Sequence, residues 1–227
     1  MNQENDILIR ISPGESRMVV ERQAGGVVTR KEVSPEGVAA CFRQSMRTEN
    51  PGMGTGLLPL NTLAVWQSDT QTRLVLWHPR RYADVALYDT PYPHFPIPRL
   101  VFGASFSTEG KLLRTRLGVV ADEVPTPETA MYHYPFSNVF ENSGQICVGS
   151  NVMPTYKHLW KAVNLPAFLL SIPNNMHMYH SLHNRLGLPY RELMEHLRDK
   201  DPDYYYTDVL IPNGKTLGDF IQGNEED

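Results

Sequence analysis

The stretch from residue 91 to residue 98, PYPHFPIP, has proline at four of its eight positions. Because proline fixes φ and has no backbone N–H to donate, this stretch cannot form the interior of a helix or a central strand of a sheet. It therefore predicts a stiff, extended segment that is not a central strand.

The chain on both sides of this proline segment reads as short strands linked by turns. Apolar and β-branched residues form runs of strand length, and Gly, Pro, Ser and Asp mark the ends of several of them. The predicted strands cover residues 7–11, 17–22, 27–33, 62–67, 73–77, 82–88, 99–102 and 111–120. Such strands, joined by short turns, favour an antiparallel β-meander.

One helix is predicted within the N-terminal part. Ser34 offers a hydroxyl that can cap free backbone amides, and Pro35 suits the first helical position, where its missing N–H would be unpaired anyway. We expect this helix to run to about Met46. Cys41 would lie on its apolar face with Val38, and is predicted to be a core residue, because a free cysteine behaves as a small hydrophobe.

The other helix signals come late in the chain. Residues 155–172 are broadly apolar-periodic, with a break expected near Pro166, and residues 188–199 form an amphipathic pattern. Residues 204–211 suggest a short strand or a docking arm. Strands first and helices last favour an α+β fold, in which helices pack on one side of an antiparallel β-meander and extra strands and a helix precede it.

The length and composition are those of a folded protein with a substantial core. The chain has 227 residues, of which 41% are hydrophobic. We expect three segments, residues 1–56 with the first strands and helix, 57–187 with the main sheet, and 188–227 with the last helix and tail, to form one compact domain.

Charge and targeting signals restrict the partners and the compartment. The formal net charge is −4 and no long run of either sign occurs, so we expect neither nucleic acid nor a membrane as a partner. The polar N-terminus does not resemble a signal peptide, and the apolar run 167–172 is far shorter than the roughly 20 residues that span a bilayer. A cytoplasmic location, with Cys41 and Cys147 as free thiols, is therefore expected.

The least ordinary stretch is YPFSNVFENSGQICVGSN, residues 134–151. It combines turn-forming asparagines and glycines with one of the only two cysteines of the chain, Cys147. Turn residues around a cysteine are typical of a loop that presents a thiol to partners. The other interpretation is that Cys147 is a buried structural thiol.

Three landmarks in this order resemble the ubiquitin-conjugating (E2) fold. Residues 92–98 followed by 100–102 look like the E2 "YPFxPPxxxF" segment. Residues 138–147, NVFENSGQIC, look like the E2 loop "HPN…NGxIC" with its catalytic cysteine, and residues 165–175, LPAFLLSIPNN, are similar to the helix that follows it. The resemblance covers roughly residues 60–175.

The chain departs from eukaryotic E2 proteins in two respects. Its N-terminal strands and its long insert before residue 134 look more like the prokaryotic E2-like proteins of plasmid-borne PRTRC gene clusters, the PRTRC system protein B family. Tyr134-Pro135-Phe136-Ser137-Asn138 also stands where the family has His-Pro-Asn. Asn138 matches the family's asparagine only if the loop carries one extra residue.

The resemblance implies a function and a set of partners. The chain would carry a bacterial ubiquitin-like protein as a thioester, receive it from an E1-like ThiF protein and pass it to an amine. A JAB-type peptidase would belong to the same system. Cys147 would form the thioester, and Asn138, or secondly Asn142, would stabilise the oxyanion. The resemblance implies no cofactor and no metal ligand.

Other interpretations remain open from the sequence. The altered His-Pro-Asn motif is compatible with a non-catalytic interaction module, in which Asn138 is only a turn residue. A cysteine hydrolase would need a histidine beside Cys147 in the fold. His177, His180 and His183 recur every third residue and could share a helical face as metal ligands, although no carboxylate is interleaved.

Overall fold

The computed structural model describes residues 6–11, 16–24, 26–45 and 56–223. The chain divides into two compact units, Met1–Gly54 and Thr55–Asp227. Among the described residues, no helix combines the length and the apolar character that crossing a membrane requires.

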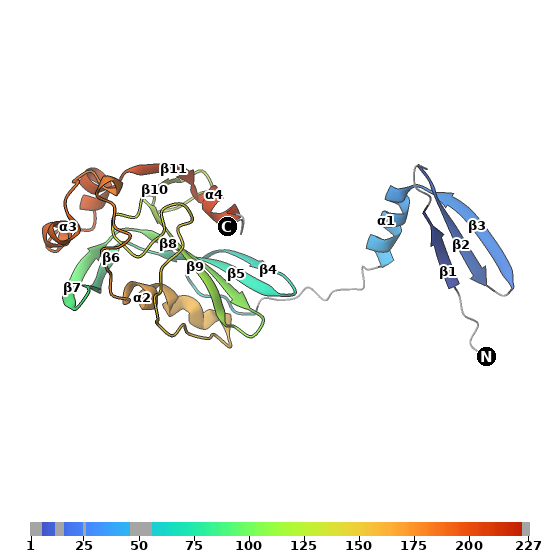
Figure 1. Ribbon diagram of the computed structural model, residues 1–227, viewed down its shortest axis with the longest axis horizontal. Helices are drawn as coiled ribbons and strands as arrows, with labels where there is room; N and C mark the ends of the chain where they lie inside the picture. The colour runs from blue at the N-terminus through green and yellow to red at the C-terminus, as the bar shows by residue number, and fades with distance from the viewer. Residues whose placement is uncertain (1–5, 12–15, 25, 46–55, 224–227) are drawn as a thin grey trace. The chain divides into compact units, whose positions relative to one another are not determined.

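The first unit is a three-stranded antiparallel sheet with one helix (Figure 1). Its strands are β1 (Asp6–Arg10), β2 (Met18–Ala24) and β3 (Val27–Val33), and its helix is α1 (Pro35–Ser45). The strands and the helix predicted from the sequence are confirmed. Ser34 caps the helix as expected, since its hydroxyl accepts the Gly37 N–H at 3.1 Å.

The prediction that Cys41 is a core residue is wrong. Cys41 and its neighbour Phe42 are exposed, whereas the half-buried positions of α1 are Pro35, Gly37 and Val38 in its first turns. The side chains of α1 that follow Val38, as far as Phe42, lie at the surface.

The second unit is built on a six-stranded sheet in the order β11-β10-β9-β8-β5-β4 (Figure 1). Every neighbouring pair is antiparallel. The strands are β4 (Thr62–Gln67), β5 (Gln71–His78), β8 (Leu100–Ser107), β9 (Leu112–Val120), β10 (Ala130–Tyr132) and β11 (Pro212–Thr216). This curled antiparallel sheet with several helices confirms the predicted α+β class.

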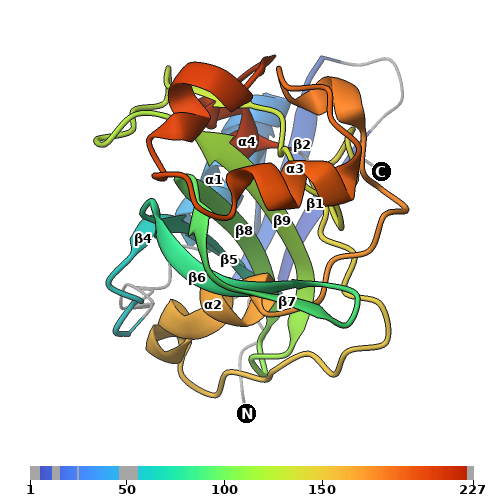
Figure 2. The ribbon, with the colours of Figure 1, turned by 90° about the vertical axis from the view of Figure 1, so that its left-hand side faces the viewer.

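The proline segment lies outside that sheet, as predicted. It forms β7 (Thr90–Ile97), which pairs only with β6 (Arg81–Leu87) in a two-stranded ribbon. Figure 2 shows this ribbon between α2 (Leu165–Leu170) and α3 (Tyr190–Leu197). A hydrogen bond of 2.8 Å from the Tyr92 hydroxyl to Glu195 ties the ribbon to α3.

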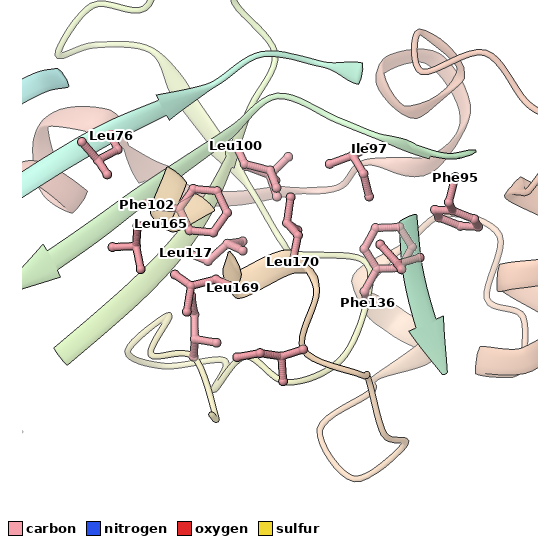
Figure 3. Close-up of a cluster of buried hydrophobic side chains, with 14 of the residues drawn as sticks. Leu76, Phe95, Ile97, Leu100, Phe102, Leu117, Phe136, Leu165, Leu169 and Leu170 are labelled. Carbon is pink, nitrogen blue, oxygen red and sulfur yellow. The ribbon is translucent and has the colours of Figure 1, made fainter. Parts of the chain in front are cut away.

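The main core fills one face of the sheet beneath α2. Strand residues alternate between the two faces, so Leu74 and Leu76 point into this core while Val75 points away. Figure 3 shows the leucines of α2 among side chains of β8 and β9. The contacting groups are Leu165, Leu169 and Leu170 on the helix, and Leu100, Phe102 and Leu117 on the strands.

One helix, α4 (Leu217–Gln222), covers the opposite face of the sheet. Its Leu217 is buried with Val75 and Val101. Thr216 and Asp219 form a reciprocal capping box that fixes where α4 begins. Neither α4 nor β11 was predicted, because both are short and follow directly upon one another.

The late part of the chain follows the prediction in one place and departs from it in another. Residues 155–172 contain the short 3₁₀ helix η1 (Leu159–Asn164) and then α2, so the predicted break near Pro166 is confirmed. The prediction of a strand or arm at 204–211 is wrong: Tyr205–Val209 forms the π-helical turn η3. Tyr205 is fully buried there, and its hydroxyl donates to the Pro96 carbonyl at 2.8 Å.

Candidate functional site

The three landmarks of the sequence meet at one place in the fold. Phe136, just before the cysteine hairpin, packs edge-to-face on Phe95 of the proline segment, with ring centroids 5.8 Å apart. It lies in the same core as Leu170 of α2 (Figure 3). The residues around Cys147 are therefore held by both of the other landmarks.

Cys147 ends a hairpin that begins at Asn138. The Cys147 N–H donates to the Asn138 carbonyl at 2.7 Å, and Val139 pairs with Ile146. Further along, the Phe140 N–H donates to the Gln145 carbonyl at 2.9 Å. We call residues 136–138 with 146–147 the hairpin base, and residues 141–143 the hairpin tip.

The returning arm of the hairpin is fixed to strand β9. The Ile146 N–H donates to the Thr115 carbonyl at 3.0 Å, and the Leu117 N–H donates to the Gly144 carbonyl at 2.8 Å. Gly144 has φ +68°, and a Cβ there would lie 3.0 Å from the Leu117 oxygen, so any other residue would be strained at this position. Ile146 is buried, while Cys147 next to it is half-buried.

Asn138 forms hydrogen bonds through both its main chain and its side chain. It is 7% exposed and has φ +65°, a conformation that asparagine tolerates better than most residues. Its amide nitrogen donates to the Pro173 carbonyl at 2.9 Å, and its amide oxygen accepts the Asn175 N–H at 3.3 Å. Its main chain holds Cys147, so this one residue connects the cysteine to the Pro-Asn-Asn segment after α2.

Asn142, the second oxyanion candidate, has a different environment. It lies at the hairpin tip with its side chain exposed. Its main-chain carbonyl accepts a hydrogen bond of 3.1 Å from the Lys215 ammonium. The structure thus brings Asn138 directly beside Cys147 in the hairpin ladder and leaves Asn142 at the far end of the hairpin.

The sequence pattern that defines prokaryotic E2 family D matches residues 41–212. This match covers most of the chain and includes all three landmarks. The chain belongs to prokaryotic E2 family D. No curated protein and no solved structure matches it.

Membership in this family gives the fold a functional setting. A prokaryotic E2-like protein indicates a role in ubiquitin-like conjugation, with ubiquitin-like and E1-like proteins as the general classes of partner. The matched residues include both cysteines, Cys41 at their first position and Cys147, which lies at the end of a hairpin whose base is buried and whose tip is exposed.

The surroundings of the Cys147 sulfur differ from those of a cysteine hydrolase. Within residues 6–11, 16–24, 26–45 and 56–223, no hydrogen bond involves the Cys147 sulfur. Activation by a neighbouring base requires an imidazole within hydrogen-bond reach of the thiol. The geometry of this family D member therefore does not support a Cys-His dyad.

A group of titratable side chains lies at the hairpin tip, and the sequence did not reveal it. Glu141 accepts from His183 Nε2 at 3.0 Å, and the His133 ring stacks on the His183 ring with centroids 4.5 Å apart. His180 stacks on the other side of His183, at 4.7 Å. His177, the third histidine of the spacing noted in the sequence, does not belong to the group of ligand atoms at His133, Glu141 and His183.

These contacts shift the ionisation of the group. Burial, and secondly the neighbouring His183, lower the pKa of His133. The hydrogen bond from His183 lowers the pKa of the Glu141 carboxyl. His133, Glu141 and His183 also line an open cleft of about 700 Å³, together with Arg73, Arg114 and Arg116. The hairpin tip thus faces a cleft that solvent and ligands can enter.

Proposed function

We propose that this protein is an E2-like carrier that holds a bacterial ubiquitin-like protein as a thioester on Cys147. One observation carries the proposal. Asn138 joins Cys147 through its main chain and the Pro173–Asn175 segment through its side chain, at 2.7, 2.9 and 3.3 Å. The residues that resemble the E2 motifs are therefore linked by hydrogen bonds around a single half-buried thiol.

The reaction consists of two acyl transfers. In the first, the Cys147 sulfur attacks the thioester carbonyl of the ubiquitin-like protein on its E1-like carrier. A new C–S bond forms and the old one breaks. The E1 cysteine leaves as a thiolate, which takes up the proton that Cys147 gives up. In the second, an amine attacks the Cys147 thioester, a C–N bond forms, and Cys147 leaves as a thiolate while the amine loses a proton.

Both steps develop negative charge on the carbonyl oxygen. A fixed amide donor near that oxygen accelerates such reactions, and loss of one donor typically costs on the order of 10²–10³ in rate. Asn138 is the candidate donor because it is fixed beside Cys147 and uses its amide nitrogen for a single acceptor, Pro173. A primary amide has a second N–H to offer. Asn142 is the reserve candidate.

The resemblance to PRTRC system protein B supplies the specific partners of this proposal. An E1-like ThiF protein would load Cys147 with a small ubiquitin-like protein, and a JAB-type peptidase of the same system would process or remove that protein. The proposed location is the cytoplasm, where a reducing environment keeps Cys147 as a thiol and ATP is available to the E1-like protein.

The test is to incubate the protein with its ThiF partner, the ubiquitin-like protein and ATP. The expected product is an adduct on a non-reducing gel that a thiol reductant removes. Cys147→Ala should abolish the adduct, and Cys147→Ser should give an oxyester that the reductant leaves intact. Cys41→Ala is the matched control and should load like the wild type, because Cys41 belongs to the other unit. No adduct with a demonstrably active ThiF protein would contradict the proposal.

A second candidate is a non-catalytic E2-fold interaction module. The observation in its favour is that Phe136-Ser137-Asn138 replaces His-Pro-Asn while Asn138 is occupied with structural hydrogen bonds. This candidate predicts that Cys147→Ala binds the partners and supports the function of the system as well as the wild type does. A loss of function with retained binding would exclude it.

A further inference from the structure

The group formed by His133, Glu141 and His183 is assembled from three separate segments. His133 directly follows β10, Glu141 lies at the hairpin tip, and His183 lies in the short 3₁₀ helix η2 (Ser181–His183). Each residue offers one ligand atom, and these atoms all lie within 4.8 Å of one another. Segments far apart in the chain thus bring two imidazoles and a carboxylate to one point.

We propose that His133, Glu141 and His183 bind a zinc-type divalent transition-metal ion, with water completing the coordination. Imidazole nitrogen and carboxylate oxygen are ligands that Zn²⁺ takes at about 2.0–2.2 Å, and three protein ligands with one open position are common in zinc proteins. Donor atoms of a tetrahedral site then lie roughly 3.3–3.5 Å apart. The group therefore needs only a modest contraction to enclose an ion.

The surroundings of the group suit an ion that arrives from solvent. The His183 side chain is 13% exposed and that of Glu141 is 55% exposed. The three residues line the wall of the open cleft, which provides an entry path. The hydrogen bond that the His183 ring donates to Glu141 already orients this ring, so part of the ordering that binding requires is present beforehand.

Two charged or titratable neighbours do not take a ligand position. The His180 ring stacks on His183, but its Nδ1 accepts the Leu182 N–H at 3.3 Å, and its atoms are not among the three that lie together. Lys215 would repel an ion, but its ammonium is held by the Asn142 carbonyl at 3.1 Å. We therefore expect His180 to support the His183 ring and Lys215 to weaken binding moderately.

Binding would have a mechanical consequence for the hairpin. Glu141 is the only one of the three ligands in the hairpin, and the other two belong to β10's end and to η2. An ion would fasten the exposed hairpin tip to these two segments. Since anything that binds only the folded state stabilises it, zinc should raise the melting temperature and slow amide exchange at residues 141–143.

The experiment is calorimetric titration of the purified protein with ZnCl₂, together with visible absorption of the Co²⁺-loaded protein. The expected result is one saturable site and the d–d bands of a low-symmetry nitrogen–oxygen site, with no binding of Mg²⁺, which prefers oxygen ligands. Glu141→Gln and His183→Ala should each weaken zinc binding by at least about 100-fold, because loss of an outer-shell partner alone already costs about 10- to 100-fold.

The control is His177→Ala, which removes an exposed histidine of the same loop and should leave zinc binding unchanged. Glu141→Gln is the decisive variant, because this side chain is exposed and its replacement does not threaten folding. The proposal is overturned if the wild type shows no saturable site, if Glu141→Gln binds zinc as the wild type does, or if His177→Ala abolishes binding. The readouts do not depend on thioester formation, so they are independent of the proposed function.

Discussion

The base and the tip of the Cys147 hairpin are built in opposite ways. At the base, Phe136, Ser137, Asn138 and Ile146 are buried, and their contacts reach the proline segment, α2 and β9. At the tip, Glu141 and Asn142 are exposed, and their contacts are to a few polar side chains. The base is thus fixed by packing across the whole unit, whereas the tip depends on polar and ionic contacts in the cleft wall.

This difference separates two tasks. A thiol that two large partners must reach needs a rigid support on one side and open surroundings on the other. Substitutions at the base should therefore change stability and positioning together, while substitutions at the tip should change ligand binding with little effect on stability.

The largest effect should come from Phe136→Ala at the base. Phe136 is 5% exposed, and its ring contacts those of Phe95, Tyr134 and Tyr205. Removal of a buried phenylalanine side chain typically costs about 3–5 kcal/mol of the free energy of unfolding. Urea unfolding followed by circular dichroism measures it. A loss below about 1 kcal/mol would mean that the base is not part of the core.

The second prediction concerns the loss of stability at low pH that a buried histidine of the core, His78, should cause. Burial, and secondly Arg81, lower the pKa of His78 from 6.5 to about 4. Between pH 6.5 and 4, His78 is therefore mostly protonated in the unfolded chain and mostly neutral in the folded protein. The contribution of His78 to the free energy of unfolding is fully present above pH 6.5. It falls as the pH drops, and at pH 4 about 3 kcal/mol has been lost.

The measurement is the free energy of unfolding at pH 7 and pH 4.5 for the wild type and for His78→Leu. The variant should lose less stability over this interval, since it lacks the buried imidazole. His183→Leu, at the tip, is the matched variant, and a reduction of the loss as large as in His78→Leu would show that the effect is not specific to the buried imidazole. Equal pH dependence in the wild type and His78→Leu would contradict the assignment.

Part of this architecture follows from the sequence. The density of proline in PYPHFPIP excludes a central strand on steric grounds, and β7 pairs only with β6. The turn residues of the N-terminal part place three strands correctly, and the E2-like landmarks predict a loop that presents Cys147, which the structure builds as a hairpin. Local chemistry determines each of these features, which is why they can be read from short stretches.

Other features depend on contacts that no short stretch contains. The tyrosine-rich segment at 204–206 looks like a strand, but burial of Tyr205 against Pro96 makes it a π-helical turn. Cys41 has the periodicity of a core residue, yet its side chain is exposed. Likewise His133 and His183 are distant in sequence, so only the fold brings them to Glu141.

A smaller effect is expected for Asn138→Ala at the base. The variant loses two side-chain hydrogen bonds and places alanine at φ +65°, which should cost about 1–3 kcal/mol of stability. Asn138→Gly separates the causes, because glycine accepts this φ but has no amide. If the amide also stabilises the oxyanion, both variants should discharge a preloaded thioester about 10²–10³-fold more slowly. Equal discharge by Asn138→Gly and the wild type would limit Asn138 to a structural role.

The smallest effect is expected for Asn142→Ala at the tip. Its side chain is exposed and only its main-chain carbonyl is bound, by Lys215, so the free energy of unfolding should change by less than about 0.5 kcal/mol. Discharge of the Cys147 thioester should also stay within about twofold if Asn138 is the oxyanion donor. A loss of about 10²-fold or more in discharge, with unchanged stability, would transfer that role to Asn142. It would also show that the tip bends toward Cys147 during the reaction. The division between a fixed base and a ligand-binding tip would then not hold for the discharge of the thioester.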